Sequence, residues 1–218
     1  MRKTLFFVAV LIAFGGTAQA ETLTDIDKVN GSIRTDDDGR YGSLETVNGS
    51  IVLANGASAQ TAETVNGSIT LRERASVDSI EAVNGSLSIG EAAQIGSAET
   101  VNGAVRFYRG SVSRGNVETV NGEIRLDAAE VGGDINTVNG DIQILDGSRV
   151  AGGIKVEKPN SGWFNWGTQR VPKVVIGANS EVVGPLVFER EVELLVHDSA
   201  RIGRVDGAEA KRFSGDQP

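Results

Sequence analysis

Apolar residues recur along the chain in pairs two residues apart, and the pairs recur about every six residues. A spacing of two is the alternation of a β-strand, whose successive side chains point to opposite faces. A longer period is superimposed on this pattern. It is marked by Val-Asn-Gly, which begins at Val29, Val47, Val65, Val83, Val101, Val120 and Val138, at intervals of 18, 18, 18, 18, 19 and 18 residues. Internal repeats of this length indicate a solenoid architecture.

The repeat becomes clearer when each unit is numbered from its Val as position 1. Positions 5, 7, 13 and 16 are mostly apolar, as at Ile69, Leu71, Val77 and Ile80, and position 11 is small, as at Ala75. Three short strands per period predict one triangular coil, whose narrow bore requires small inward residues. We therefore expect an all-β fold: a single-stranded, triangular parallel β-helix (β-solenoid) with about 18 residues per coil and about 4.8 Å between coils.

A β-hairpin array is the competing interpretation, since Asn-Gly between alternating apolar residues is the strongest short hairpin signal. A hairpin around Asn48-Gly49 would place Thr46 opposite Ile51 and Leu44 opposite Leu53. The solenoid is favoured because the residue types return in translation and not in mirror order. The six-residue spacing also continues without Asn-Gly between Ile176 and Ala200.

The solenoid interpretation stacks each repeated residue on its equivalent in the next coil. Side-chain amides can then hydrogen-bond from coil to coil. The Gly after each Asn is expected to supply a positive φ at the corner. The predicted structural ladder consists of Asn30, Asn48, Asn66, Asn84, Asn102, Asn121 and Asn139.

The chain is expected to divide into a signal peptide, one solenoid domain and a tail. Residues 1–20 carry Arg2 and Lys3, an apolar run too short to span a membrane, and a small-x-small site ending at Ala20. Residues 21–205 would form the solenoid, and residues 206–218 a polar C-terminal tail over the last coil. The protein is therefore predicted to be exported to the periplasm, the cell surface or the medium, with no transmembrane span.

One insertion, residues 158–173, interrupts the repeat between Pro159 and Pro172. It contains both tryptophans of the chain, and insertions in solenoids project from one corner. Aromatic rings beside cationic groups are suited to an envelope glycan, a protein or a membrane interface. The alternative is that the rings cover part of the solenoid wall. The candidate binding residues are Lys158, Trp163, Phe164, Trp166, Arg170 and Lys173.

An acidic column accompanies the repeat at position 17, formed by Glu45, Glu63, Glu81, Glu99 and Glu118, and it ends at Asn136. Like charges at strand spacing repel each other, so the side chains must splay apart, be screened or be bridged by cations. Carboxylates can bind Ca²⁺, but this ion takes six to eight oxygens, more than one column supplies. A solvated acidic face is the simpler interpretation.

Composition excludes several classes of function. The chain has no Cys and one His, which excludes a disulfide framework, a thiolate site and a His cluster. The net charge is −8, and removing Arg2 and Lys3 makes it −10, which argues against a nucleic-acid partner. His197, Asp198 and Ser199 are adjacent and cannot form a triad. We therefore expect no enzyme activity, no catalytic residues, no metal site and no cofactor.

The Val-Asn-Gly-Ser-Ile units from Val29 to Ile144 resemble a bacterial adhesin-like β-strand-repeat family of unknown function. The segment from Val174 to Gly203 resembles the coils of bactofilins, which are polymer-forming β-helix proteins. The resemblance implies a right-handed triangular β-helix in a bacterial envelope protein. Bactofilins are cytoplasmic, whereas this chain carries a predicted signal peptide, so their cytoskeletal role is not carried over.

Three hypotheses of function follow from these patterns. The first is an exported, non-enzymatic, structural or adhesin-like envelope protein that presents the aromatic loop for binding. The second is a carbohydrate-binding or polysaccharide-acting β-helix. The third is a polymer that self-associates by end-to-end stacking of coils.

Overall fold

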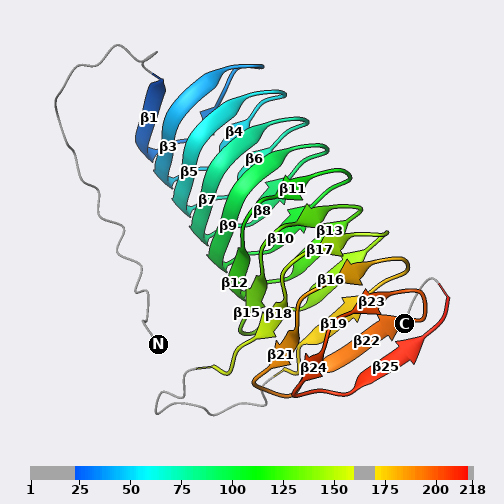
Figure 1. Ribbon diagram of the computed structural model, residues 1–218. Coiled ribbons are helices and arrows are strands. Elements are labelled where there is room, and N and C mark those ends of the chain that lie inside the picture. The colour runs from blue at the N-terminus through cyan, green and yellow to red at the C-terminus, as the bar shows by residue number, and fades with distance from the viewer. Residues whose placement is uncertain (1–22, 160–169, 216–218) are drawn as a thin grey trace.

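The computed structural model describes residues 23–159 and 170–215, and every regular element in them is a β-strand. The strands stack as successive coils of one rod, with β1 at one end and β25 at the other (Figure 1). The predicted all-β solenoid with coils of about 18 residues is therefore confirmed. The predicted signal peptide and the three aromatic residues of the insertion lie outside the described residues.

One wall of the rod is a parallel sheet that takes one strand from each of ten coils. Its strands begin at positions 4 or 5 of the repeat, where Ile and Val recur. In spatial order they are β2 (Ile33–Arg34), β4 (Ile51–Leu53), β6 (Ile69–Leu71), β8 (Leu87–Ile89), β10 (Val105–Phe107), β13 (Ile124–Asp127), β16 (Ile142–Leu145), β19 (Lys173–Ile176), β22 (Glu193–His197) and β25 (Ala210–Phe213).

The remaining two sides of each coil belong to a second parallel sheet of fifteen strands. In the first coils one long strand covers both sides: β1 (Thr24–Asn30), β3 (Arg40–Asn48), β5 (Ser58–Asn66), β7 (Ser76–Asn84) and β9 (Gln94–Asn102). Later coils use two shorter strands: β11 (Val112–Ser113) with β12 (Val117–Asn121), β14 (Glu130–Val131) with β15 (Ile135–Thr137), β17 (Arg149–Val150) with β18 (Ile154–Val156), β20 (Glu181–Val182) with β21 (Leu186–Phe188), and β23 (Arg201–Ile202) with β24 (Val205–Asp206).

The extra residue of the 19-residue interval explains why the long strand divides. Strand β9 pairs with both β11 and β12, through Ile95 opposite Ser113 and Ala98 opposite Val117. Ile95 and Ala98 are three residues apart on β9, but their partners Ser113 and Val117 in the next coil are four residues apart. The additional residue widens the corner and breaks the ladder there, as a bulge does.

Strand register excludes the hairpin interpretation. All pairings are parallel, and each residue lies opposite its own equivalent in the next coil, as Asn48 does with Asn66 and Glu63 with Glu81. A hairpin array would give antiparallel pairs. Residues that are one repeat apart in the sequence therefore lie one strand spacing apart along the rod.

The core fills the bore of the coils with the residues that the repeat predicts. Ile69, Leu71, Ala75, Val77 and Ile80 represent one coil, and each is at most 2% exposed. A further inward position was not identified from the sequence. It is position 18, where the hydroxyl of Thr64 donates to the carbonyl of Gly49 at 2.9 Å, and Thr46, Thr100 and Thr119 make the same bond in their coils.

The predicted reason for the corner glycines is wrong for most of them. Only Gly31 among the Val-Asn-Gly glycines has a positive φ. At the others the requirement is a close approach between coils: a Cβ on Gly49 would lie 2.2 Å from the carbonyl oxygen of Gly31, and one on Gly67 would lie 1.9 Å from that of Gly49. The left-handed conformation recurs instead at position 10, as at Arg74 and Ala92.

The solenoid extends beyond the predicted boundary at Val205. Strand β25 pairs in parallel with β22 through residue Phe213, and Ala208 and Ala210 pack against the core. The apolar pattern did not predict this strand because Lys211 and Arg212 are charged, and Arg212 replaces the apolar residue that this column carries in the preceding coils.

Candidate functional site

The insertion occupies the Asn-Gly corner of its coil. Thr137 lies opposite Val156 before the insertion, and Ile142 lies opposite Val174 after it. The segment between Val156 and Val174 therefore takes the place of Asn139, Gly140 and their flanking residues. It emerges between β18, in the fifteen-stranded sheet, and β19, in the ten-stranded sheet.

Four contacts attach the two ends of the insertion to the rod. The backbone N–H of Lys158 donates to Glu189 Oε2 at 3.2 Å, and that of Lys173 donates to Asp141 Oδ1 at 2.9 Å. The Arg170 guanidinium forms an ion pair with Asp141. The backbone carbonyl of Arg170 accepts a hydrogen bond from Arg190 Nη2 at 3.0 Å. The carboxylate of Asp141, only 18% exposed, thus holds the returning end of the insertion through both a main-chain and a charged contact.

The structure places the seven repeated asparagines in a continuous amide ladder. Each Nδ2 donates to the Oδ1 of the asparagine in the preceding coil, at 2.9–3.1 Å, from Asn48 on Asn30 to Asn139 on Asn121. Because all donors point the same way, the ladder leaves an acceptor at its Asn139 end. The asparagine side chains bind one another and stiffen the corner.

Arg190 continues this ladder across the insertion. It follows Phe188 by two residues, as Asn139 follows Thr137, so it occupies the asparagine position one coil beyond the insertion. Its Nη1 donates to Asn139 Oδ1 at 2.7 Å and to the carbonyl of Val138 at 3.0 Å. Sequence reasoning missed this residue, although aligning the coils after the insertion by their apolar positions would have placed it in the column.

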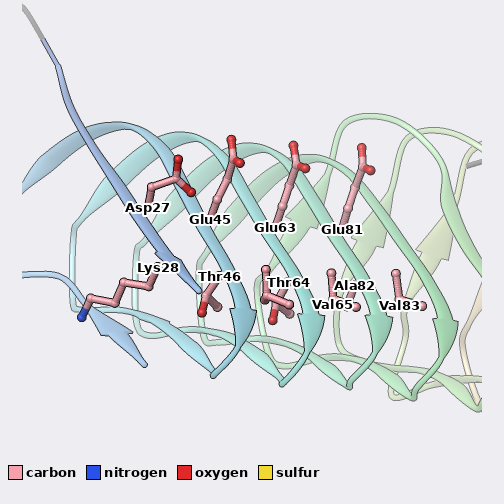
Figure 2. Close-up of a pocket in the computed structure, with 11 residues that line it drawn as sticks. Asp27, Lys28, Glu45, Thr46, Glu63, Thr64, Val65, Glu81, Ala82 and Val83 are labelled. Atoms are coloured by element: carbon pink, nitrogen blue, oxygen red, sulfur yellow. The ribbon is translucent and has the colours of Figure 1, made fainter. Parts of the chain in front are cut away.

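The acidic column is aligned as predicted and is one residue longer, since Asp27 lies opposite Glu45. Figure 2 shows the carboxylates of Asp27, Glu45, Glu63 and Glu81 in a row, pointing the same way. Burial raises the pKa of Glu99 to about 7, with further increases from Glu118 and Glu81. Burial and the neighbouring carboxylates also raise the pKa of Glu63.

The column ends at groups that can bind a carboxylate. Asn136 Nδ2 donates to Glu118 Oε1 at 3.2 Å. In the next coil Lys155 takes the same position, and its ammonium contacts Glu157 at 2.8 Å and Glu189 at 3.1 Å. Within the described ranges, no three acidic or histidine side chains converge as metal ligands.

Two shallow grooves lie beside the acidic column, one in the first coils and one that reaches Glu157, next to the start of the insertion. In the first coils the groove is open to solvent and lies between the acidic residues and the outward Val47, Val65 and Val83. Figure 2 shows this stretch. The second groove is lined by Glu99, Glu118 and Glu157, the last of which directly precedes Lys158. The sequence pattern did not predict either groove, because outward Val residues cannot be distinguished from core Val residues without the structure.

His197 is the last residue of β22 and directly precedes a turn. Its Nδ1 is 2.8 Å from Ser199 Oγ, and its ring packs edge-on against Phe213 with centroids 5.2 Å apart. These contacts give the imidazole a local structural role.

The fold and these surfaces define a class, a parallel β-solenoid repeat protein with one corner insertion. Comparison with protein-family models, curated proteins and solved structures finds no match to any of the three. The described residues form no helix that is long and apolar enough to cross a membrane.

Proposed function

We propose that the protein is an exported, non-enzymatic structural component of a bacterial cell envelope, and that its 158–173 insertion binds another envelope component. Export is supported by the signal-peptide pattern of residues 1–20, and the bacterial envelope by the resemblance of the repeats. The proposed mechanism is display, in which a rigid rod of stacked coils holds one binding segment at a fixed corner.

The observation that carries this proposal is the way in which the insertion is attached. Asp141, Glu189 and Arg190 fix its two ends by hydrogen bonds and an ion pair, so the regular coils continue without a break on either side. Arg190, one coil after the insertion, also donates to Asn139, one coil before it, so the asparagine column is continued past the insertion. Tryptophans are the residues most enriched at binding hot spots, and both tryptophans lie between these attachment points.

The test replaces residues 158–172 by the Asn-Gly of the neighbouring coils, which restores the regular corner. Binding of the mature chain to purified peptidoglycan sacculi and to outer-membrane vesicles would be measured by co-sedimentation. We expect the wild type to bind one of these materials and the replacement to bind at least about tenfold more weakly, a loss of about 1.4 kcal/mol. Trp163→Ala with Trp166→Ala should reproduce most of this loss.

A matched control changes an aromatic residue elsewhere on the surface. Tyr108→Ala removes an exposed ring from the corner after β10 and should leave binding unchanged. Circular dichroism would establish that each variant is folded. Equal binding by wild type and replacement, or binding of the wild type to neither material, would contradict the proposal.

A further inference from the structure

The first and last coils each carry a cationic residue at a position that is inward and uncharged in the coils between them. Lys28 lies opposite Thr46, in the column that continues through the buried Thr64 and Ala82. Arg212 lies opposite Val196, in the column of the buried Ile176 and Ile144. Lys28 lies on β1, which pairs only with β3 in the fifteen-stranded sheet, and Arg212 lies on β25, an end strand of the ten-stranded sheet, so both residues lie where the stack of coils ends.

Lys28 takes the place of a backbone donor that the first coil lacks. In the following coils, the carbonyl at position 4 accepts from the coil before it: Ser50 from the N–H of Ile33 at 2.9 Å, and Ser68 from that of Ile51 at 3.0 Å. Among residues 23–159 and 170–215, no strand precedes β2 in this sheet to donate to the equivalent carbonyl of Ser32. The Lys28 ammonium donates to it instead, at 2.8 Å.

Arg212 does the same at the other end of the rod. Carbonyls at position 11 accept from the coil that follows: Ser148 from the N–H of Glu181 at 2.9 Å, and Ser180 from that of Arg201 at 3.0 Å. The equivalent carbonyl in the last coil belongs to Ala200. Arg212 Nη1 lies 3.3 Å from this oxygen and 3.1 Å from the carbonyl of His197.

We propose that Lys28 and Arg212 block the two ends of the rod against head-to-tail addition of a second copy of this chain. Open sheet ends are templates for pairing, and inward-pointing charges are a known means of preventing it. An incoming copy would have to displace the cationic group from its carbonyl to place its own N–H there. It would then bury that group between two coils, where an unpaired charge is costly.

Charged side chains on the outer face of the rod also oppose the addition of a second copy. Continuing the register past the last coil would place Lys211 of one copy opposite Arg34 of the next, since both belong to position 6. Asp206 would likewise lie opposite Asp27, both at position 17. Like charges directly opposite each other destabilise a strand pair, although salt screens such exposed pairs.

The test restores the residue of each column with Lys28→Thr and Arg212→Val. Analytical ultracentrifugation would be run at about 1 M salt, where the Debye length is about 3 Å and the outward pairs are screened. We expect monomers for the wild type and for each single variant, because every contact then still includes one blocked end. An equimolar mixture of the two single variants should double in mass, and the double variant should form rods whose length grows with concentration.

The control removes the same two residue types from outward positions of the same coils. Arg34→Val with Lys211→Thr should remain monomeric, because Lys28 and Arg212 still cover the ends. Assembly of this control, filaments of the wild type, or a mixture of folded single variants that stays monomeric would each overturn the proposal. The mixture decides the matter even where the double variant does not fold.

Discussion

At the scale of single residues, this fold uses glycine for two separate physical reasons. At position 3 the backbones of successive coils approach so closely that no Cβ fits, as at Gly67. At position 10 the chain turns with a positive φ, as at Gly110, where the space around a Cβ is open. Arg74 and Ala92 adopt the same left-handed conformation at this position of the two preceding coils. The first requirement is steric and strict, whereas the second is conformational and milder.

Gly67→Ala and Gly110→Ala should therefore differ in cost. We expect about 3 kcal/mol or more for Gly67→Ala, because the backbone of two coils must move apart. Gly110→Ala should cost about 1 kcal/mol, the strain of an L-residue at positive φ offset by a lower unfolded-state entropy. Urea unfolding of the two variants measures both values, and equal costs would show that close approach is not the reason for Gly67.

At the scale of elements, stacking identical strands aligns like charges as well as like apolar groups. The strands β3, β5, β7, β9 and β12 each contribute one glutamate to the same column. Partial burial of this face, and after it the neighbouring carboxylates, raise the pKa of Glu63 and Glu99. The folded chain binds protons on this face more tightly than the unfolded chain does.

The stability of the rod should accordingly depend on pH through Glu99. Its folded pKa of about 7 exceeds the ordinary value of 4.5, so its contribution is most favourable below about pH 4.5 and is lost as the pH rises through 7. Glu99→Gln should match the wild type at pH 4 and be more stable at pH 8, by about 1–2 kcal/mol after solvent screening. Thermal melting across this range measures the difference.

The control for this experiment is Glu91→Gln, which removes one negative charge from an exposed corner of the adjacent turn. This variant shows what the loss of one exposed carboxylate does to the melting temperature under the same conditions. A difference for Glu99→Gln that did not grow between pH 4 and pH 8 would be inconsistent with a crowded, partly buried column.

At the scale of the whole molecule, the rod behaves as a one-dimensional array whose coils contact only their neighbours. The stability of such arrays is close to a sum of coil and interface contributions. Its length is then set by the number of coils and by what stops the stack at each end. Lys28 and Arg212 prevent further coils from adding at the two ends. The insertion distinguishes one coil from the others along the rod.

Deleting one complete coil, residues 66–83, should leave the fold intact. The deletion keeps every column in register, and small-angle scattering should show a rod shorter by about 4.8 Å. Deleting residues 66–74 removes half a coil, an odd number of residues, and moves inward side chains to the outer face. That variant should lose its β circular dichroism, whereas equal behaviour of the two deletions would contradict the columnar packing.

The repeat alone determined the architecture, because an 18-residue period with two-residue alternation fixes which side chains face the bore, the coil stacking and the asparagine and glutamate columns. Only the tertiary structure showed which groups contact the asparagine and glutamate columns at their ends and how closely successive coils approach each other. It showed that Arg190 continues the asparagine column one coil after the insertion and that the corner glycines are required by close approach of the backbones. It also showed the groove lined by outward Val residues and the contacts of Lys28 and Arg212 at the two ends of the rod. These features depend on the distances between coils and on which carbonyls lack an N–H donor from an adjacent coil. A periodic sequence does not show either of these.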